Sequence, residues 1–243
     1  MKTKLGTWLS IGSPVIAELA AQSGFDWLLL DLEHGCGSEA AILPQLQAIR
    51  GTGVSAMVRV GAPHPDLIAR VLDWGVHGIM VPHVNSATEA EEIVRSTRYS
   101  PGGHRGYSRT VRANDYGLRP IGEVPPPMVM AQIETIEGVR CAGEIAQVDG
   151  IDVLFIGPAD LGHDLQHRAE AAPGDYDHCL SLVVEAARAA GKRSGILLRD
   201  VSDLAKYRDL GFTHLAVDSD LAILRQSYQQ TNLAAKALAP HLS

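Results

Sequence analysis

The chain has 243 residues, of which 46% are hydrophobic, and a formal net charge of −7 at pH 7. This length fits one large domain with a substantial core, and no run approaches the ~20 apolar residues of a membrane span. The acidic balance argues against a nucleic-acid partner, because phosphate backbones attract basic surfaces.

The first half of the chain alternates short apolar runs with segments whose apolar residues recur at helical spacing. An apolar run without internal alternation is typical of a strand that is buried on both faces, as in parallel sheets. Pro65 suits a first helical turn, and Ser86 with Glu89 has the pattern of a capping box. In chain order we expect strand 5–12, helix 14–24, strand 25–30, helix 38–50, strand 54–60, helix 64–74, strand 78–83 and helix 86–98.

A Gly- and Pro-containing segment, 99–127, interrupts this rhythm, which then resumes. We expect strand 128–134, helix 138–147, strand 151–157, a loop, helix 176–190, strand 193–198, helix 201–209, strand 213–218 and helix 221–238. Eight apolar strands that alternate with helices are typical of a closed parallel barrel, and the Gly-rich first turn of a dinucleotide-binding sheet is absent. The sequence therefore predicts an α/β fold, a TIM (β/α)8 barrel, with residues 1–243 as a single domain.

Ionisable side chains gather where the predicted strands end. The stretch 27–35, Trp-Leu-Leu-Leu-Asp-Leu-Glu-His-Gly, runs from four apolar residues into two acids and a histidine. The carboxyl ends of barrel strands form the catalytic face in enzymes of this architecture. Other polar residues at such ends are Arg59, His83, Gln132, Glu134, Asp160 and Asp218. These strands are distant in sequence, but their carboxyl ends meet at one face of a barrel. The pattern therefore predicts one catalytic rim.

Glu134 and Asp160 are the best candidates for metal ligands. Each follows an apolar strand, and the two strands are expected to be neighbours. Two carboxylates, waters and a chelating substrate suit Mg²⁺, Mn²⁺ or Co²⁺ better than structural zinc. The alternative is that both acids pair with arginines or cap the helices that follow.

Arg59 and His34 are the candidates for charge stabilisation and proton transfer. Arginine offers a fixed fork to a carboxylate or a developing enolate oxygen, although Arg59 could instead pair with Asp31 or Glu33. His34 beside Asp31 has the pattern of a base whose tautomer is set by an acid. Three other histidines, His64, His83 and His104, are expected to be rim or loop residues.

The lysines are informative by their positions. They are Lys2, Lys4, Lys192, Lys206 and Lys236, and none lies at the carboxyl end of a predicted strand. A Schiff-base aldolase needs a desolvated lysine in its site. Carbanion chemistry on this chain would therefore need a metal ion instead.

The cysteines and the start of the chain indicate the compartment. Cys36, Cys141 and Cys179 lack the spacing of a disulfide framework or a thiolate metal site. Residues 1–5 contain no apolar segment like that of a signal peptide. We therefore expect a cytoplasmic protein.

Five segments, which together span most of the chain in order, carry a family resemblance. They are 27–35, Met57-Val-Arg-Val60, Gly78-Ile-Met-Val-Pro82, Gln132-Ile-Glu-Thr135 and Phe155-Ile-Gly-Pro-Ala-Asp-Leu161. As a set they resemble the HpcH/HpaI aldolases, the metal-dependent (class II) pyruvate aldolases such as 2,4-dihydroxyhept-2-ene-1,7-dioate aldolase and the 2-keto-3-deoxy-sugar-acid aldolases. Leu32 differs from the glycine that many sugar-acid aldolases have there.

The resemblance implies a role for each matched residue. Glu134 and Asp160 are similar to the family's metal ligands, His34 with Asp31 to its catalytic pair, and Arg59 to its enolate-stabilising arginine, while Glu33 is expected to orient this network. The implied substrate-binding residues are Trp8, Gln132, Pro158, Ala159 and Leu197, the backbone N–H groups of Ala159 and Asp160 holding a carboxylate.

The resemblance also implies an activity and an assembly. The fold would be a barrel of the phosphoenolpyruvate/pyruvate-binding type, which uses a divalent metal ion to cleave a 4-hydroxy-2-oxo acid reversibly to a 2-oxo acid and an aldehyde. Alternatives are an oxaloacetate decarboxylase or another lyase that uses the same enolate, and a non-catalytic ligand-binding barrel. The implied assembly is a homohexamer, a trimer of dimers, in which helix 221–238 packs on a neighbouring subunit.

Overall fold

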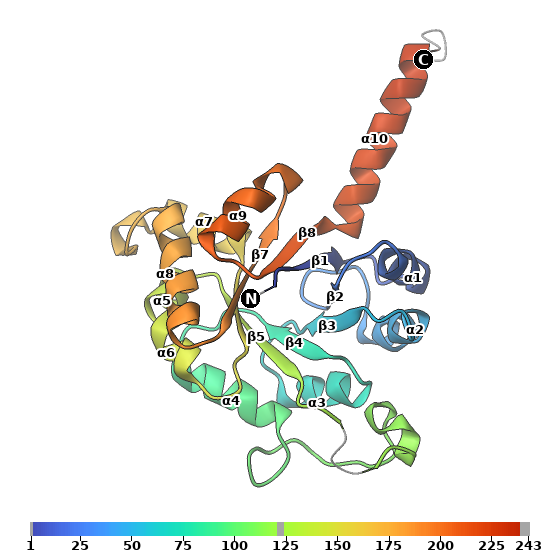
Figure 1. The fold of residues 1–243 in the computed structure, drawn as a ribbon, viewed down its shortest axis with the longest axis vertical. Coiled ribbons are helices and arrows are strands. Elements are labelled where there is room, and N and C mark those ends of the chain that lie inside the picture. Colours follow the sequence, from blue (N-terminus) through green and yellow to red (C-terminus); the bar gives the residue numbers. More distant parts are fainter. Residues whose placement is uncertain (1, 121–123, 239–243) are drawn as a thin grey trace.

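A computed structural model describes residues 2–120 and 124–238, in which eight parallel strands close into a barrel surrounded by helices (Figure 1). Each strand pairs with the next in sequence, and β8 returns to pair with β1. The strands are β1 Lys4–Leu9, β2 Trp27–Asp31, β3 Ser55–Arg59, β4 Gly78–Val81, β5 Met128–Ile133, β6 Val153–Ile156, β7 Arg193–Leu198 and β8 His214–Ser219. The predicted TIM barrel is confirmed.

Helices follow the strands, and all but the last, which extends away, cover the outside of the barrel (Figure 1). They are α1 Pro14–Gln22, α2 Ile42–Ala48, α3 Pro65–Asp73, α4 Ala87–Thr97, α5 Ile136–Arg140, α6 Ala142–Gln147, α7 Pro158–His167, α8 Tyr176–Ala189, α9 Leu204–Leu210 and α10 Asp220–Leu238. Short 3-10 turns lie at Glu39–Ala41, Arg112–Gly117, Ala169–Ala171 and Val201–Asp203. Segment 99–127 is otherwise irregular as expected, and 121–123 lie outside the described residues.

Two sequence predictions were wrong locally. A helix, α7, begins directly after β6 where we expected a loop, and Leu161 is its one buried residue, so it lacks the apolar period that would have revealed it. The first strand ends at Leu9, not at residue 12, because the backbone N–H groups of Ser10 and Ile11 donate to the Asp220 carboxylate (2.9 and 3.1 Å) instead of continuing the sheet.

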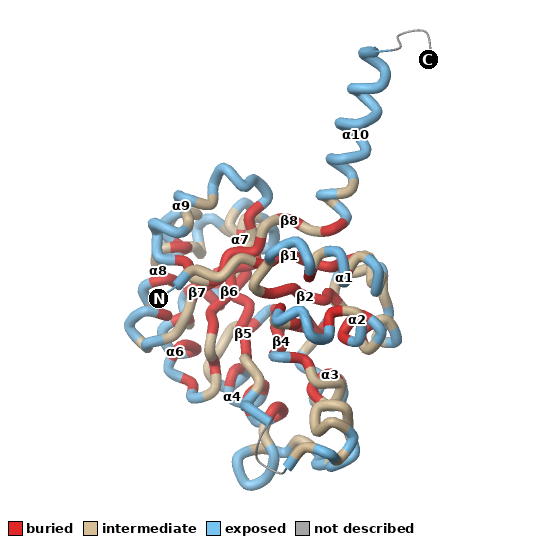
Figure 2. Tube along the Cα trace, turned by 45° about the vertical axis from the view of Figure 1, so that its right-hand side comes forward, coloured by how far each residue is buried: buried red, intermediate tan, exposed pale blue. Residues whose placement is uncertain are grey.

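Alternate residues along each strand pack on the two sides of the barrel wall. In β2, Leu28 and Leu30 pack in the outer core against the helices, whereas Trp27 and Leu29 belong to the cluster inside the barrel. The strands are buried and α10 is largely exposed, extending away from the barrel (Figure 2). This continuous core fixes the strand ends in space, and with them the polar residues that follow.

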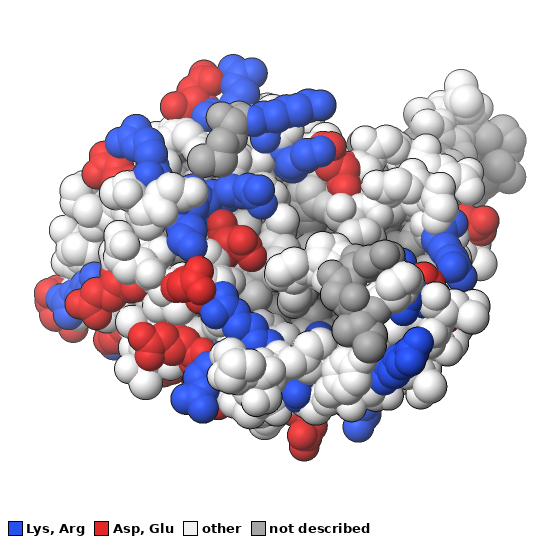
Figure 3. Space-filling model, turned by 60° about the horizontal axis from the view of Figure 1, so that its bottom comes forward, with Lys and Arg blue, Asp and Glu red and all other residues white. Residues whose placement is uncertain are grey.

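No helix in the described part of the chain is long and apolar enough to cross a bilayer. On the face drawn in Figure 3, basic and acidic side chains lie among each other and leave wide uncharged areas.

Candidate active site

The β2–β3 pairing places Asp31 directly beside Arg59 at the carboxyl end of the barrel. Both side chains are almost completely buried. The Arg59 guanidinium donates from Nε to Oδ1 of Asp31 (2.9 Å) and from Nη2 to Oδ2 (2.7 Å). This two-point contact fixes the orientation of the guanidinium plane, as is typical of an arginine–carboxylate pair.

Glu33 gives Arg59 a second anionic partner. Arg59 Nη1 lies 2.8 Å from Glu33 Oε2. Burial alone would lower the pKa of the Arg59 guanidinium, but the hydrogen bonds and charge of Asp31, followed by the charges of Glu33 and Glu134, raise it above its ordinary value. Arg59 is therefore a permanent cation at the mouth of the barrel, and the ion-pair alternative that the sequence left open is present.

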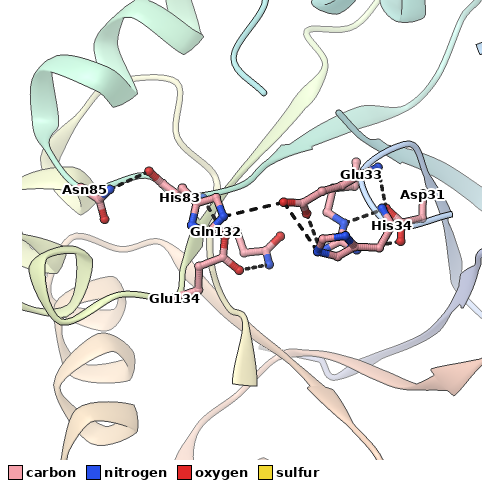
Figure 4. A network of polar contacts seen from close by, with 8 residues as sticks. Asp31, Glu33, His34, His83, Asn85, Gln132 and Glu134 are labelled. Carbon is pink, nitrogen blue, oxygen red and sulfur yellow. Dashed lines mark hydrogen bonds and ion pairs between the residues drawn. The ribbon is translucent and has the colours of Figure 1, made fainter. Parts of the chain in front are cut away.

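His34 lies at the same rim, but its imidazole is not held in the way we expected. Asp31 Oδ1 accepts from the backbone N–H groups of Glu33 (3.0 Å) and His34 (3.4 Å), so Asp31 shapes the turn and does not contact the ring. The imidazole is exposed, and its Nε2 lies 3.9 Å from Glu33 Oε1 (Figure 4). The histidine is thus free to meet a ligand, with Glu33 as its neighbouring acid.

Glu134 follows β5 and is buried, with 2% of its surface exposed. Its Oε1 accepts from the backbone N–H of His83 (2.8 Å), and its Oε2 accepts from Nε2 of Gln132. Burial raises the pKa of the Glu134 carboxyl, the contacts with His83 oppose this, and the charges of Glu33 and Asp160 raise it further. Among the described residues, the Glu134 carboxylate is paired with the imidazole of His83 and with no lysine or arginine. Figure 4 shows it facing His83 and Gln132.

His83 is a site residue to which the sequence analysis gave too little weight. Its Nδ1 lies 3.2 Å from Glu134 Oε1 and its Nε2 lies 3.8 Å from Glu33 Oε1. The backbone of His83 is left-handed (φ 54°), and Asn85 Nδ2 donates to its carbonyl oxygen (3.0 Å). A non-glycine residue in this region costs about 1–3 kcal/mol and tends to mark functional sites. Its position at the end of β4 was the signal that could have found it.

Glu33, His83 and Glu134 form a cluster in which one ligand atom of each lies within 4.8 Å of the others. Asp160 is outside this cluster, exposed in the first turn of α7, although its charge is close enough to act on Glu134. Gln132 Oε1 is buried without a hydrogen-bond partner among the described residues. An unpaired acceptor beside clustered carboxylates fits a divalent cation, whose ligands are oxygen and imidazole nitrogen.

A cavity of about 150 Å³ opens at this rim. The predicted site residues that line it are Trp8, Asp31, His34, Arg59, Gln132, Pro158, Ala159, Asp160 and Leu197. Glu33 and Glu134 lie beside it, Glu134 Oε2 being only 2.2 Å from where a Cβ on the lining residue Gly157 would be. Gly157 therefore has to be a glycine, because any side chain would displace the buried carboxylate.

Three polar lining residues, Ser10, Arg199 and Ser219, were missed from the sequence. Arg199 Nη1 donates to Asp218 Oδ1 (3.3 Å). Arg199 directly follows β7, and Asp218 lies near the end of β8. The start of α7 adds backbone donors, because its N-cap, Gly157, has no side chain to satisfy the first N–H groups. An anionic ligand would meet these N–H groups and the positive charge of Arg59, whose Nε/Nη2 edge is held by Asp31, around one cavity.

Comparison with known proteins gives a consistent result. The sequence model of the family described as HpcH/HpaI aldolase/citrate lyase matches residues 4–227. The chain is 36% identical to 5-keto-4-deoxy-D-glucarate aldolases of Shigella boydii serotype 18 and Escherichia coli O6:H1, over 94% of this chain and 90% and 91% of the relatives.

Solved structures give the same likeness. An HpcH/HpaI aldolase/citrate lyase family protein from Burkholderia cenocepacia has a TM-score of 0.90 at 33% identity, covering 97% of this chain and 95% of that one. A structure described as citrate synthase SbnG has a TM-score of 0.84 at 28% identity, covering 99% and 96%.

Proposed function

The chain belongs to the HpcH/HpaI aldolase/citrate lyase family, and from that premise we propose that it is a divalent-metal-dependent aldolase. It would cleave a 4-hydroxy-2-oxo acid reversibly to pyruvate, or a related 2-oxo acid such as hydroxypyruvate, and an aldehyde. The observation that carries this proposal is the buried Glu134 carboxylate, which lies among Glu33, His83 and Asp160 beside the fixed Arg59 guanidinium.

Glu134 and Asp160 would hold the ion, with Glu33 and His83 near enough to act as further ligands. When bound, a divalent cation supplies Lewis acidity toward the carboxylate and 2-oxo oxygens of a substrate. A set made of carboxylates suits Mg²⁺ or Mn²⁺, and the imidazole of His83 would shift the preference toward Mn²⁺ or Co²⁺.

The chain's own groups divide the remaining work. Arg59 stabilises the negative charge that develops on the 2-oxo oxygen, and it needs no reorganisation because Asp31 already fixes its plane. The N–H groups of Ala159 and Asp160 bind the substrate carboxylate. His34 accepts the proton of the 4-hydroxyl group during cleavage and returns it during condensation, with Glu33 as the acid beside it.

The second candidate is another lyase reaction through the same enolate that needs no aldehyde, such as oxaloacetate decarboxylation. The solved structure described as citrate synthase SbnG, which matches nearly the whole chain, carries the name of a reaction other than aldol cleavage. A non-catalytic binding barrel is the third, and the assembled rim residues speak against it.

Proton exchange of pyruvate tests the shared step without knowledge of the aldehyde. Protein loaded with Mn²⁺, Co²⁺ or Mg²⁺ is incubated with pyruvate in D₂O, and loss of the methyl signal is followed by NMR. We expect exchange that chelation abolishes and that Glu134→Gln lacks. A folded, metal-loaded protein that exchanges no faster than metal ions alone would contradict the proposal.

The aldehyde partner is then sought in both directions. 5-Keto-4-deoxy-D-glucarate is the first cleavage substrate because the relatives carry its name. Condensation is screened with pyruvate or hydroxypyruvate and a panel of aldehydes. Faster release of CO₂ from oxaloacetate than any aldehyde-dependent turnover would favour the second candidate.

Titration with Mn²⁺ followed by electron paramagnetic resonance separates the two possible ligand sets. If Glu134 and Asp160 hold the ion, Asp160→Asn weakens Mn²⁺ binding more than His83→Ala. The opposite order would assign the ion to the Glu33, His83 and Glu134 cluster. We further propose a cytoplasmic location and a homo-oligomeric assembly.

A further inference from the structure

A second and larger cavity, of about 460 Å³, lies at the opposite end of the barrel. Its lining comes from the first residues of most strands or from residues just before them. The lining residues are Lys2, Lys4, Asp26, Trp27, Ser55, Met57, His77, Met128, Met130, Arg193, Thr213 and His214. We call this the amino-end cavity, and none of the aldolase site residues lines it.

The inner part of the amino-end cavity is apolar. Trp27, Met57 and Met130 belong to the buried cluster inside the barrel, and Met128 packs against that cluster. Methionine side chains are flexible and polarisable, so they adapt to ligands of different shape. An apolar body placed here would release water from an apolar surface, which is favourable.

The outer part is cationic. Lys2, Lys4 and Arg193 line it with one acid, Asp26, whose charge is already matched by Lys4 Nζ (2.7 Å) and the backbone N–H of Leu5 (2.9 Å). The Arg193 side chain has no ion pair or hydrogen bond within residues 2–120 and 124–238. A chain with a net charge of −7 thus concentrates unmatched positive charge at this opening.

His77 adds a hydrogen-bond donor with a defined tautomer. Its Nδ1 accepts from the backbone N–H of Ala56 (3.0 Å), so the ring proton is on Nε2. Burial, opposed by that hydrogen bond, lowers the pKa of His77 below its ordinary value, and the ring is neutral at pH 7. Its Nε2–H has no partner among the described residues and is available to an acceptor.

We propose that the amino-end cavity binds a small amphipathic carboxylic acid, its carboxylate on Arg193 and its apolar body on the methionines and Trp27, with the Nε2–H of His77 as a further donor on the lining. The volume is within the range of about 300–1,000 Å³ that is typical of small-molecule sites. Arginine suits a planar carboxylate because its guanidinium donates in a matching fork. The proposal is independent of the aldolase assignment, because the two cavities share no lining residue.

Methyl NMR of the full-length protein, labelled with ¹³C at the methionine methyl groups, tests this directly. Three of the five methionines line the amino-end cavity, and Met80 in the barrel interior does not. Titration with octanoate is expected to shift the signals of Met57, Met128 and Met130 saturably and to leave Met80 nearly unchanged. Titration with pyruvate, which has no comparable apolar body, is expected to shift none of the three.

Two comparisons test the headgroup. Arg193→Gln is expected to weaken octanoate binding by about ten-fold or more, as for loss of a charge-assisted hydrogen bond. Arg188→Gln makes the same change on the exposed surface of α8, outside the cavity, and is expected to leave binding unchanged. With the wild-type protein, 1-octanol is expected to bind at least about ten-fold more weakly than octanoate. Unchanged methyl signals at millimolar octanoate, or equal affinity for octanoate and 1-octanol, would overturn the proposal.

Discussion

Arg59 is held on several sides before any substrate arrives. Asp31 fixes its plane, Glu33 lies against Nη1, and the Trp8 ring centroid lies 5.6 Å from its Cζ. A charge buried in this way is costly unless it is fully paired, and here the pairing is supplied by Asp31 at the end of β2 and by Glu33 just after it. The contacts that stabilise the Arg59 cation also orient its guanidinium. A substitution can therefore remove the orientation and keep the charge.

Arg59→Lys keeps the positive charge and removes the fork. We expect a loss of about 10²-fold in kcat for pyruvate proton exchange, because an ammonium cannot reproduce the two-point contact. Arg59→Ala should lose about 10²–10³-fold and also unfold more easily, by about 3–5 kcal/mol, since Asp31 is left buried and unpaired. Kinetics together with urea unfolding separate the two effects. Near wild-type exchange in either variant would contradict the role given to Arg59.

His214 couples the amino end of the barrel to pH. Burial, with the charges of Arg193 and Lys4, lowers its pKa from 6.5 to about 4. In the unfolded chain His214 therefore binds a proton as the pH falls below about 6.5, whereas in the native state it does so only near pH 4. The stability linked to this group is complete above pH 6.5 and is lost as the pH falls toward 4.

From pH 7 to pH 4.5 this linkage should lower the free energy of unfolding by roughly 2–3 kcal/mol. His214→Gln, which cannot titrate, should lose correspondingly less stability over the same range. Urea unfolding at both pH values measures the difference. If the wild type and the variant lose the same amount, the imidazole of His214 is not the responsible group.

The residues that sequence could predict are those whose role follows from their place on a strand. Asp31, Arg59, Gln132 and Glu134 end or follow apolar runs, and the barrel brings those ends together. His83 was underrated because its importance comes from a left-handed backbone and a contact with a residue 51 positions away, neither of which is written locally. The contact expected between Asp31 and the His34 ring failed for a similar reason, since Arg59 occupies both carboxylate oxygens.

The strands could be predicted because eight apolar runs that alternate with helices have few alternatives to a closed barrel. Helix α7 could not be predicted. Its sequence, PADLGHDLQH, buries only Leu161, so its stability comes from Pro158 at the first turn and from Arg168, which pairs with Asp164 and Glu137. A helix that is held by its ends and by salt bridges lacks the apolar stripe on which sequence periodicity depends.

Inside the barrel, small residues on some strands make room for large ones on their neighbours. A Cβ on Gly195 in β7 would lie 2.4 Å from the Phe155 ring in β6, and one on Gly6 in β1 would lie 2.3 Å from the Trp27 ring in β2. The aromatic side chains themselves meet edge to face, with the Trp27 and Phe155 ring centroids 6.1 Å apart. These strands are therefore matched in shape as well as in register.

Gly195→Ala should destabilise the barrel by about 1–3 kcal/mol, because the added methyl group forces Phe155 out of its packed position. Gly143→Ala is the matched control: it lies in α6, nothing lies within 4 Å of the added Cβ, and the change should stabilise by about 0.5–1 kcal/mol. Thermal unfolding of both variants measures the contrast. Equal effects of the two substitutions would show that the fit between β6 and β7 is not tight.

At the scale of the whole molecule, α10 extends away from the barrel and is exposed along its length (Figure 1 and Figure 2). Its base is fixed, because the Asp220 carboxylate accepts from the backbone of Ser10 and Ile11 at the end of β1. Large apolar side chains remain in solvent along it, including Tyr228 at 71% and Leu238 at 87%. An isolated helix of this kind gains little stability from its own sequence, since tertiary packing normally supplies it.

We therefore propose that α10 packs on a neighbouring copy of the chain, as the family resemblance implies. Leu221, Leu224, Tyr228, Ala235 and Leu238 recur at helical spacing and form one stripe that a second subunit would cover. The exposed Val15 and Leu19 on α1 are a candidate partner surface. Because α10 begins beside the catalytic rim, assembly would also reach the site, where Gln226 Nε2 donates to Asp218 Oδ2 (3.3 Å).

Tyr228→Asp places a charge in the centre of this stripe and should reduce the mass of the assembly measured by light scattering after size exclusion, because an unpaired charge in an apolar interface is costly. Gln229→Asp adds the same charge one residue further on, roughly 100° around the helix and off the stripe, and should leave the mass of the wild type unchanged. The comparison removes net charge and helix propensity as explanations, since both variants gain one aspartate in the same turn. A wild-type protein that is monomeric at micromolar concentration would contradict assembly through α10. So would two variants that both keep the mass of the wild type.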